Sequence, residues 1–378
     1  MNIEASELFR PTWAEINLEA IKHNYKAIKK LVSRSVGIMA VVKANAYGHG
    51  MRTIAYEAVR NGAAYLGVAR VDEGLEIRKA GLGQPVLVFE VPPPAHLDRA
   101  IVDGLELTAP SVEHAEAISS AAGRQQRKAK IHAKVDTGMG RLGIQYQQAV
   151  DAIEKIARLP GIELTGVYSH FATSDEIDQS FASDQLDRFS QVLDGLEHRR
   201  ICVPLKHMAN SGAIISLPSS SFDMVRPGIM LYGYPPRNGM QVKHPLVPVL
   251  SLVSQVTFMK HVPKGTSISY GRRYTAPSDT SIATVPVGYG DGYSRLLTNN
   301  VEVLIRGRRY PAVGTICMDH FTVDVGNASE IGVGDTVTLI GKDGNEDISA
   351  WELAEKLQTI PYEVTCMISS RVLRYYNE

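Results

Sequence analysis

The stretch AVVKANAYGHG (residues 40–50) joins an apolar, β-branched run to a loop of small residues, glycine, tyrosine and histidine. Lys43 stands where the two segments meet. A short apolar run of this kind indicates a buried strand. A lysine at its end is either a solvated surface charge or a reactive amine held in place, and the rest of the chain decides between the two.

The same pattern recurs through the first 230 residues. Its eight apolar runs are VGIMAVVK (36–43), AYLGVAR (64–70), PVLVFE (85–90), LELTA (105–109), KIHAKVD (130–136), IELTGVYS (162–169), PLKHMA (204–209) and FDMVR (222–226). Amphipathic helical stretches such as SVEHAEAISSAAG (111–123) lie between most of them. Eight βα units predict an α/β fold, a TIM-type (β/α)8 barrel, for which roughly 250 residues is typical. A doubly wound open sheet is the alternative.

The character of the sequence changes near residue 235. YPPRNGMQVKHPLVP (234–248) contains four prolines and a glycine and is typical of a linker. Strand-like runs follow, with one predicted helix, ISAWELAEKLQ (348–358). We therefore predict a barrel domain over residues 1–240 and a mostly β C-terminal domain over residues 241–378.

The composition argues against several classes of protein. Of 378 residues, 40 are Lys or Arg and 40 are Asp or Glu, without a charged block, so no nucleic-acid or membrane partner is expected. No apolar run approaches the roughly 20 residues that cross a bilayer, and the N-terminus MNIEASELFR does not resemble a signal peptide. Cys202, Cys317 and Cys366 fit neither a disulfide framework nor a metal cluster. We expect a cytoplasmic protein without a metal site.

Basic and polar residues gather at the ends of the predicted strands, where barrel enzymes place their catalytic groups. They are Lys43, Lys134, Asp136, Arg141, His170, His207, Asn210, Ser211 and Arg226. Each alone has an ordinary structural explanation; Lys134, for example, needs a partner in its apolar run, and Asp136 is one candidate. GMGRLG (138–143) formally matches a dinucleotide motif, but the next strand begins rather than ends with an acid, Glu163.

The loops after the seventh and eighth predicted strands are suited to a phosphate. ANSG (209–212) and RPGI (226–229) contribute a hydroxyl group, small residues and backbone N–H groups. A short helix starting near Ser211 would add its positive end. A phosphate site and the amine of Lys43 at one barrel mouth indicate pyridoxal 5'-phosphate, whose aldehyde forms a Schiff base with lysine. Tyr47 could donate to the same phosphate.

Nine blocks in order resemble the alanine racemase family. They are AVVKANAYGHG, KVDTGMGRLG, HFATSDE, ANSGA, VRPGIMLYG, ISYGRRYTA, VPVGYGDGYSR, VGTICMDH and PYEVTCMISSRV, and the resemblance extends from RPTWAEINL (10–18) to SSRVLR (369–374). It implies a barrel followed by a β domain, with residues 10–17 pairing in the β domain. It also implies a head-to-tail homodimer with shared active sites, which interconverts L-alanine and D-alanine by a two-base mechanism and supplies D-alanine for peptidoglycan.

The resemblance also implies roles for single residues. Lys43 resembles the lysine that carries the cofactor as a Schiff base, and Tyr270 the opposing base from the other subunit. Arg226 would face the pyridine nitrogen, with His207 behind it. Arg141 would contact the substrate carboxylate and the phenolic oxygen of the cofactor, supported by Lys134 as a carbamate. The other implied cofactor contacts are Tyr47, His170, Asn210, Ser211, Gly228, Ile229 and Tyr362; the implied substrate loop is Cys317, Met318 and Asp319; and Tyr289 and Tyr293 would line the access route.

Three other functions fit parts of the sequence. A fold-related decarboxylase of basic amino acids also has a strand-end lysine, but an acid rather than Arg226 would be expected at the pyridine nitrogen. A non-catalytic pyridoxal-phosphate carrier would resemble the barrel alone and leave the β domain unexplained. A racemase of serine or of a larger amino acid is the third alternative.

Overall fold

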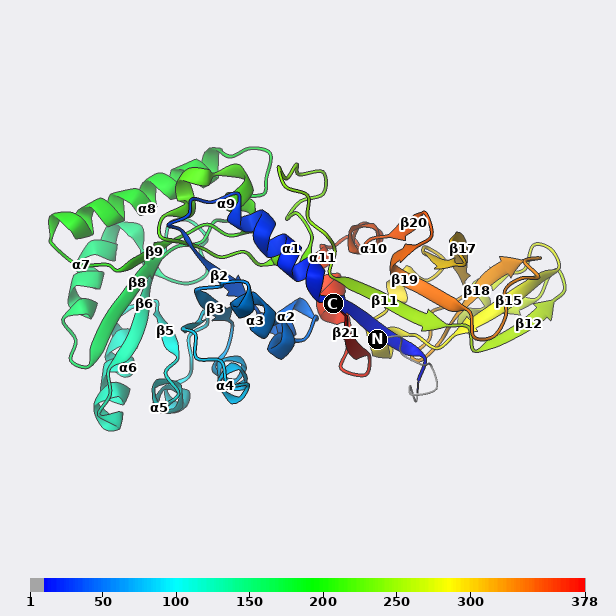
Figure 1. The fold of residues 1–378 in the computed structure, drawn as a ribbon, viewed down its shortest axis with the longest axis horizontal. Helices are drawn as coiled ribbons and strands as arrows, with labels where there is room; N and C mark the ends of the chain where they lie inside the picture. Colours follow the sequence, from blue (N-terminus) through cyan, green and yellow to red (C-terminus); the bar gives the residue numbers. More distant parts are fainter. Residues whose placement is uncertain (1–9, 378) are drawn as a thin grey trace. The chain divides into compact units, whose positions relative to one another are not determined.

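The computed structural model describes residues 10–377, whose contacts divide them into two units (Figure 1). The barrel unit comprises Ile21–Ala46 and Gly50–Val247. The β unit comprises the described residues up to Ala20, Tyr47–His49 and the chain from Pro248 onward. No helix within residues 10–377 is both long enough and apolar enough to span a membrane.

The barrel unit contains a parallel sheet whose strands follow one another in chain order. They are β2 (Gly37–Val41), β3 (Tyr65–Val68), β4 (Val86–Val88), β5 (Glu106–Ala109), β6 (Ala129–Asp136), β8 (Ile162–Tyr168), β9 (Leu205–His207) and β10 (Met224–Val225). The last strand, β10, pairs with the first, β2. Backbone N–H groups of Asp223 and Arg226 donate to carbonyl oxygens of Lys206 and Ala209, which links β10 to β9. The predicted barrel is confirmed, and the open sheet is wrong because the strand order never reverses.

Helices cover the outside of these strands (Figure 1). They are α3 (Met51–Arg60), α4 (Val71–Lys79), α5 (Pro94–Val102), α6 (Val112–Gln125), α7 (Tyr146–Ala157), α8 (Ser180–His198) and the short α9 (Ser211–Ser216), while α1 (Leu18–Lys29) leads into the unit. Met39, Leu87 and Met224 pack together as a fully buried cluster among the strands. Burying each such side chain stabilises the fold by about 1.5–3 kcal/mol. The strands therefore form a rigid base for the loops at their carboxyl ends.

The β unit contains a long mixed sheet that includes both ends of the described chain. Its strands, in spatial order, are β12 (Phe258–Val262), β15 (Thr280–Val285), β18 (Phe321–Gly326), β17 (Arg308–Val313), β16 (Glu302–Ile305), β19 (Thr336–Asp343), β11 (Leu250–Gln255), β1 (Thr12–Asn17) and β21 (Leu373–Asn377). Strand β1 is antiparallel to β11 and parallel to β21. The N-terminal strand thus belongs to this sheet and not to the barrel.

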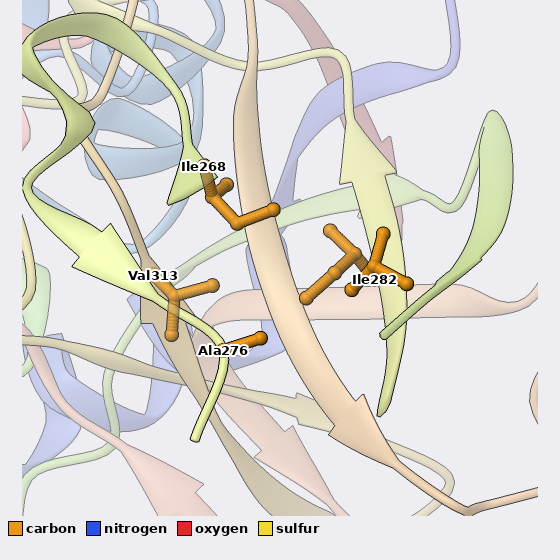
Figure 2. Packing of buried hydrophobic residues seen from close by; sticks show 5 residues of the cluster. Ile268, Ala276, Ile282 and Val313 are labelled. Carbon is orange, nitrogen blue, oxygen red and sulfur yellow. The ribbon is translucent and has the colours of Figure 1, made fainter. Parts of the chain in front are cut away.

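A small apolar core supports the hairpin of β13 (Ser267–Ile268) and β14 (Tyr274–Thr275). Figure 2 shows Ile268, Ala276, Ile282 and Val313 of this cluster, all at most 4% exposed. Ile268 anchors one end of the turn that carries Tyr270. The position of this turn is therefore determined by packing on the sheet.

Two helices, and not one, lie near the end of the β unit. The predicted helix is α10 (Ala350–Leu357), capped by Ser349, whose Oγ accepts from the Glu352 N–H. A second helix, α11 (Pro361–Met367), follows after a left-handed Gln358. The prediction of a single helix was wrong. Pro361 was the available signal, because proline is favoured in the first helical turn.

Candidate active site

Lys43 begins a left-handed turn directly after strand β2. The turn is α2 (Lys43–Tyr47), and φ is 52–53° at each of the four residues that follow Lys43. Each L-residue in this conformation costs roughly 1–2 kcal/mol, because its Cβ approaches a carbonyl oxygen. Strain of this kind occurs at functional sites, where the surrounding structure maintains it.

Two side chains of the barrel unit hold the turn. Glu73 of α4 accepts from the Ala44 N–H at 2.7 Å with Oε1 and from the Ala69 N–H at 2.8 Å with Oε2. Asn45 Oδ1 accepts from the Met51 N–H at 2.9 Å, at the start of α3. Both flanking helices therefore fix the backbone next to the lysine.

Glycine in this turn is expected to stabilise the protein. Ala44→Gly removes the clash between the Cβ and a carbonyl oxygen, which stabilises the folded state. Glycine also makes the unfolded chain more flexible, which offsets part of this gain. The free energy of unfolding should therefore rise by about 0.5–1 kcal/mol. The matched control is Ala152→Gly in the right-handed α7, which should lower it by about the same amount. Urea denaturation of both variants measures the difference. A fall for Ala44→Gly would show that the turn is not left-handed in solution.

Arg226 follows β10 and is a buried cation without a carboxylate partner among residues 10–377. It is 4% exposed, and no ion pair joins it to an acid anywhere in the described chain. Nη1 donates to His207 Nδ1 at 2.8 Å, and Nη2 donates to the Ser169 and Met208 carbonyl oxygens at 2.7 and 3.0 Å. Within residues 10–377, Nε has no hydrogen-bond partner. Burial lowers the pKa of Arg226 to about 10, so the side chain is still charged at neutral pH.

Lys134, on β6, is a buried amine. It is 5% exposed, and Nζ has no hydrogen-bond partner among the described residues. The expected partner, Asp136, instead accepts from the Gly138 and Gly140 N–H groups at 2.9 and 3.1 Å. The interpretation of Lys134 and Asp136 as an ion pair was therefore wrong. Burial lowers the Lys134 pKa well below 10.5, and the charges of Arg226 and Arg141 lower it further.

The ring of Tyr168 lies among these charged groups. Its centroid is 4.7 Å from Lys134 Nζ and 5.4 Å from Arg226 Cζ, and the ring stacks on His207 at 4.9 Å. A cation near an aromatic face gains about 0.5–2 kcal/mol. The sequence did not single out this residue, although it lies at the end of the sixth predicted strand.

The His170 imidazole lies close to Arg226, and burial and the charges of the cluster lower its pKa. Its Nδ1 lies 3.2 Å from Arg226 Nη2. Desolvation by the surrounding protein lowers the His170 pKa well below 6.5, and Arg226, Lys134, Arg141 and Lys43 lower it further. The imidazole is therefore neutral at physiological pH, and four predicted cations act on one ring.

Backbone donors converge on the hydroxyl group of Ser211. Its Oγ accepts from the Gly228 N–H at 3.0 Å and from the Met230 N–H at 3.4 Å, on either side of Ile229. Converging backbone N–H groups favour an anion. Asn210 is the N-cap of α9, and its Oδ1 accepts from the Ala213 N–H.

Tyr47 and Tyr362 belong to the β unit and lie close together. Their ring centroids are 5.8 Å apart. Gly48, with φ of 85°, lies so close to the Thr365 carbonyl group of α11 that a Cβ would clash with it. The Gly48 carbonyl oxygen accepts from Arg374 Nε at 3.0 Å. These contacts place the two phenol rings side by side.

Tyr270 projects from a turn of the β unit and is 72% exposed there. Its carbonyl oxygen accepts from Thr315 Oγ1 at 2.6 Å, and Ser269 Oγ donates to the Thr315 carbonyl oxygen at 2.7 Å. Ser269 Oγ also lies 3.5 Å from Cys317 Sγ. The turn is therefore tied to the loop of residues 317–319.

Gly288, Gly290 and Arg371 contact the loop of residues 317–319. Carbonyl oxygens of Cys317 and Met318 accept from the N–H groups of residues 289 and 290 at 3.0 and 2.9 Å, and a Cβ on Gly288 would clash with both. Arg371 pairs with Asp319 at 2.6 Å. Met318 is 53% exposed. Of the two tyrosines expected to line the access route, Tyr289 is exposed, whereas Tyr293 is buried against Phe321.

Comparison with known families covers nearly the whole chain. Residues 16–236 match the alanine racemase N-terminal domain, and residues 249–376 match the alanine racemase C-terminal domain. The chain belongs to the alanine racemase family. Alanine racemase 2 of Caldanaerobacter subterraneus subsp. tengcongensis is 46% identical over 97% of this chain and 95% of its own length. The alanine racemase of Halothermothrix orenii is 44% identical over 97% of each chain.

Solved structures of alanine racemases have the same fold. That of the Clostridium difficile 630 alanine racemase superposes with a TM-score of 0.95 at 38% identity, and covers 98% of this chain and 97% of its own. The family resemblance inferred from nine sequence blocks is therefore confirmed.

The structure divides the predicted site residues of this alanine racemase family member between its units. The barrel unit brings together Lys43, Lys134, Arg141, His170, His207 and Arg226, as well as Ser211, Gly228 and Ile229. The β unit holds Tyr47, Tyr270, Cys317, Met318, Asp319 and Tyr362. Arg141 is exposed and follows Gly138 and Gly140, both with positive φ. Glu73 and Tyr168 were missed, because their partners lie on other strands and no local pattern marks them.

Proposed function

We propose that this protein is a homodimeric racemase that interconverts L-alanine and D-alanine with pyridoxal 5'-phosphate. The observation that carries the proposal is Arg226, a buried cation with an unused Nε donor and no carboxylate neighbour in the described chain. Arginine can only donate, so it suits an unprotonated ring nitrogen. A decarboxylase of this fold would be expected to have an acid there. We further propose that the enzyme works in the cytoplasm and supplies D-alanine for peptidoglycan.

The residues present fit this cofactor. Arg226 has a donor for a ring nitrogen, the donors around Ser211 suit a phosphate, and Lys43 supplies an amine at a strand end. The residues that would hold the cofactor are Lys43, Tyr47, His170, His207, Asn210, Ser211, Arg226, Gly228, Ile229 and Tyr362. When bound, it would spread the negative charge that remains after the α-proton leaves. Because Arg226 keeps the ring nitrogen unprotonated, we expect little transamination.

Racemisation requires a base on each face of the α-carbon. We assign Lys43 to one face and Tyr270 of the partner subunit to the other, since amine and phenol groups can both accept and release a proton. Arg141 and the Met318 backbone N–H would bind the substrate carboxylate, with Cys317 and Asp319 shaping that loop.

The surface of the β unit supports a second subunit. Tyr270, Tyr289 and Met318 are 72%, 42% and 53% exposed there and come from neighbouring loops. Exposed apolar and aromatic groups gathered in this way mark interaction sites. A second copy would cover them and would receive Tyr270 in its own barrel mouth.

The test is to incubate the holoenzyme with L-alanine and separately with D-alanine, and to resolve the products by chiral chromatography. Each enantiomer should yield the other. L-serine run in parallel measures substrate selectivity, and carbon dioxide released from lysine or ornithine would identify a decarboxylase. Absence of interconversion in the presence of added cofactor would refute the proposal.

Lys134 is expected to carry a carbamate. Its lowered pKa increases the share of unprotonated amine, the form that reacts with carbon dioxide, and the carbamate would place a negative charge near Arg226 and Arg141. Protein equilibrated with 13C-bicarbonate should show a carbamate NMR signal that is missing in Lys134→Ala. Lys130→Ala, at an exposed position of the same strand, should retain it. An unmodified Lys134 in fully active enzyme would contradict the assignment.

A further inference from the structure

A chain of four buried polar side chains crosses the barrel interior behind Arg226. Glu106, His132, His207 and Arg226 are 2%, 0%, 0% and 4% exposed. Glu106 Oε2 lies 2.7 Å from His132 Nε2, His132 Nδ1 lies 2.9 Å from His207 Nε2, and His207 Nδ1 lies 2.8 Å from Arg226 Nη1. The four residues come from β5, β6, β9 and the residue after β10, so the chain exists only in the closed barrel.

The arginine determines the direction of every hydrogen bond in this chain. Arginine has donors but no acceptor, so His207 Nδ1 must carry no proton. A neutral His207 then carries its proton on Nε2 and donates to His132 Nδ1. His132 in turn carries its proton on Nε2 and donates to Glu106, which must accept as a carboxylate.

Other protonation states conflict with the arginine. A protonated Glu106 would donate to His132 and reverse both imidazoles, so that a proton on His207 Nδ1 would face the Arg226 N–H. A doubly protonated His132 would reverse His207 in the same way. Although His132 and Glu106 are close enough for an ion pair, the chain is compatible only with a neutral imidazole beside a carboxylate. Burial and the charge of Arg226 lower the His207 pKa well below 6.5, in agreement with a neutral ring.

Neighbouring aromatic rings fix the planes of the two imidazoles. Tyr168 stacks on His207 with an interplanar angle of 6°, and Tyr65 meets His132 edge-on at 6.0 Å. Burial raises the pKa of Tyr65, and the nearby Glu106 carboxylate raises it further. A half-turn of either imidazole about its Cβ–Cγ bond would keep the plane of the ring but put carbons where the nitrogens lie, so the hydrogen bonds decide which edge of each ring faces its neighbours.

We propose that Glu106 and His132 are positioning residues that keep His207 in its Nε2–H form and thereby hold Arg226 as a charged donor facing the active site. Glu106 supplies the negative end of the chain and Arg226 the positive end, and two neutral imidazoles connect them. Linked hydrogen bonds in a low-dielectric interior strengthen one another. The effect on catalysis rests on the proposed racemase function, whereas the direction of the hydrogen bonds does not.

Neutron diffraction from deuterium-exchanged crystals tests the direction directly. We expect deuterium on Nε2 of both His132 and His207 and on neither Nδ1. Deuterium on His207 Nδ1, or on both nitrogens of His132, would overturn the proposal. A protein with the expected pattern that fails to racemise alanine would refute the proposed function and leave the chain intact.

Two variants test the role of the chain in catalysis. Glu106→Gln retains an oxygen that can accept from His132, so it should keep the imidazole pattern and most of the activity. Glu106→Leu removes the acceptor, and kcat should fall roughly tenfold, by analogy with outer-shell partners of metal-bound histidines. Its spectrum should also show a larger share of transaminated cofactor after prolonged turnover, because Arg226 is held less firmly.

Glu163→Leu, at an exposed position on β8, is the matched control. It should change neither kcat nor the share of transaminated cofactor. Equal kcat and equal transamination in Glu106→Leu and wild type would overturn the positioning role. If Glu106→Leu does not fold, Glu106→Gln tests the positioning role instead. A Glu106→Gln protein with protons on Nδ1 of both imidazoles and an unchanged kcat would contradict the proposal.

Discussion

Lys43→Ala is expected to lose nearly all alanine racemisation, with kcat lower by about 10³-fold or more. A positioned general base contributes roughly 10²–10⁴-fold, and this lysine is also the amine that would attach the cofactor. The left-handed turn holds the backbone at this position between two helices. Chiral chromatography gives the rate, and the absorption of the protein after dialysis shows whether the cofactor is still attached.

Lys130→Ala is the control for loss of a lysine from the barrel, because Lys130 is exposed on β6. It should retain both the rate and the bound cofactor. Substantial racemisation by Lys43→Ala would exclude the lysine as a base and would refute the proposed two-base arrangement.

Tyr270→Phe should slow the two directions of proton transfer unequally. The ring remains and only the hydroxyl group is lost, so proton removal from L-alanine should fall by about 10²-fold or more, and removal from D-alanine by much less. Solvent-deuterium exchange into each enantiomer, measured at early times, separates the two faces. Tyr376→Phe, at an exposed tyrosine of the β unit outside the proposed site, is the control. Equal losses for both enantiomers would contradict the assignment of faces.

Mixed dimers of these two variants test whether the site is shared. If Tyr270 acts on the partner subunit, a dimer of one Lys43→Ala and one Tyr270→Phe chain contains one complete site. Random exchange should then restore roughly a quarter of wild-type activity, because half of the dimers are mixed and half of their sites are intact. No recovery after exchange would place both bases in one chain and overturn the shared site.

Much of the barrel could be predicted because its signals are local. All eight predicted strands occur, since alternation between apolar β-branched runs and amphipathic helices is encoded within a few residues of each element. The strand ends then placed Lys43, His170, His207 and Arg226 at one edge. The helix α11 was missed because its seven residues are too few for a periodic signal.

The sequence by itself determined the order of barrel and β domain, the family, and which polar residues end the strands. The tertiary structure decided which of those residues meet and in which state. Within residues 10–377 it left Lys134 Nζ without a hydrogen-bond partner, turned Asp136 toward glycine N–H groups, and linked Glu106 to Arg226 through two imidazoles. The physical reason is that strand formation follows from neighbours in the chain. Hydrogen-bond direction and charge depend instead on groups from distant strands that meet only when the barrel closes and excludes water.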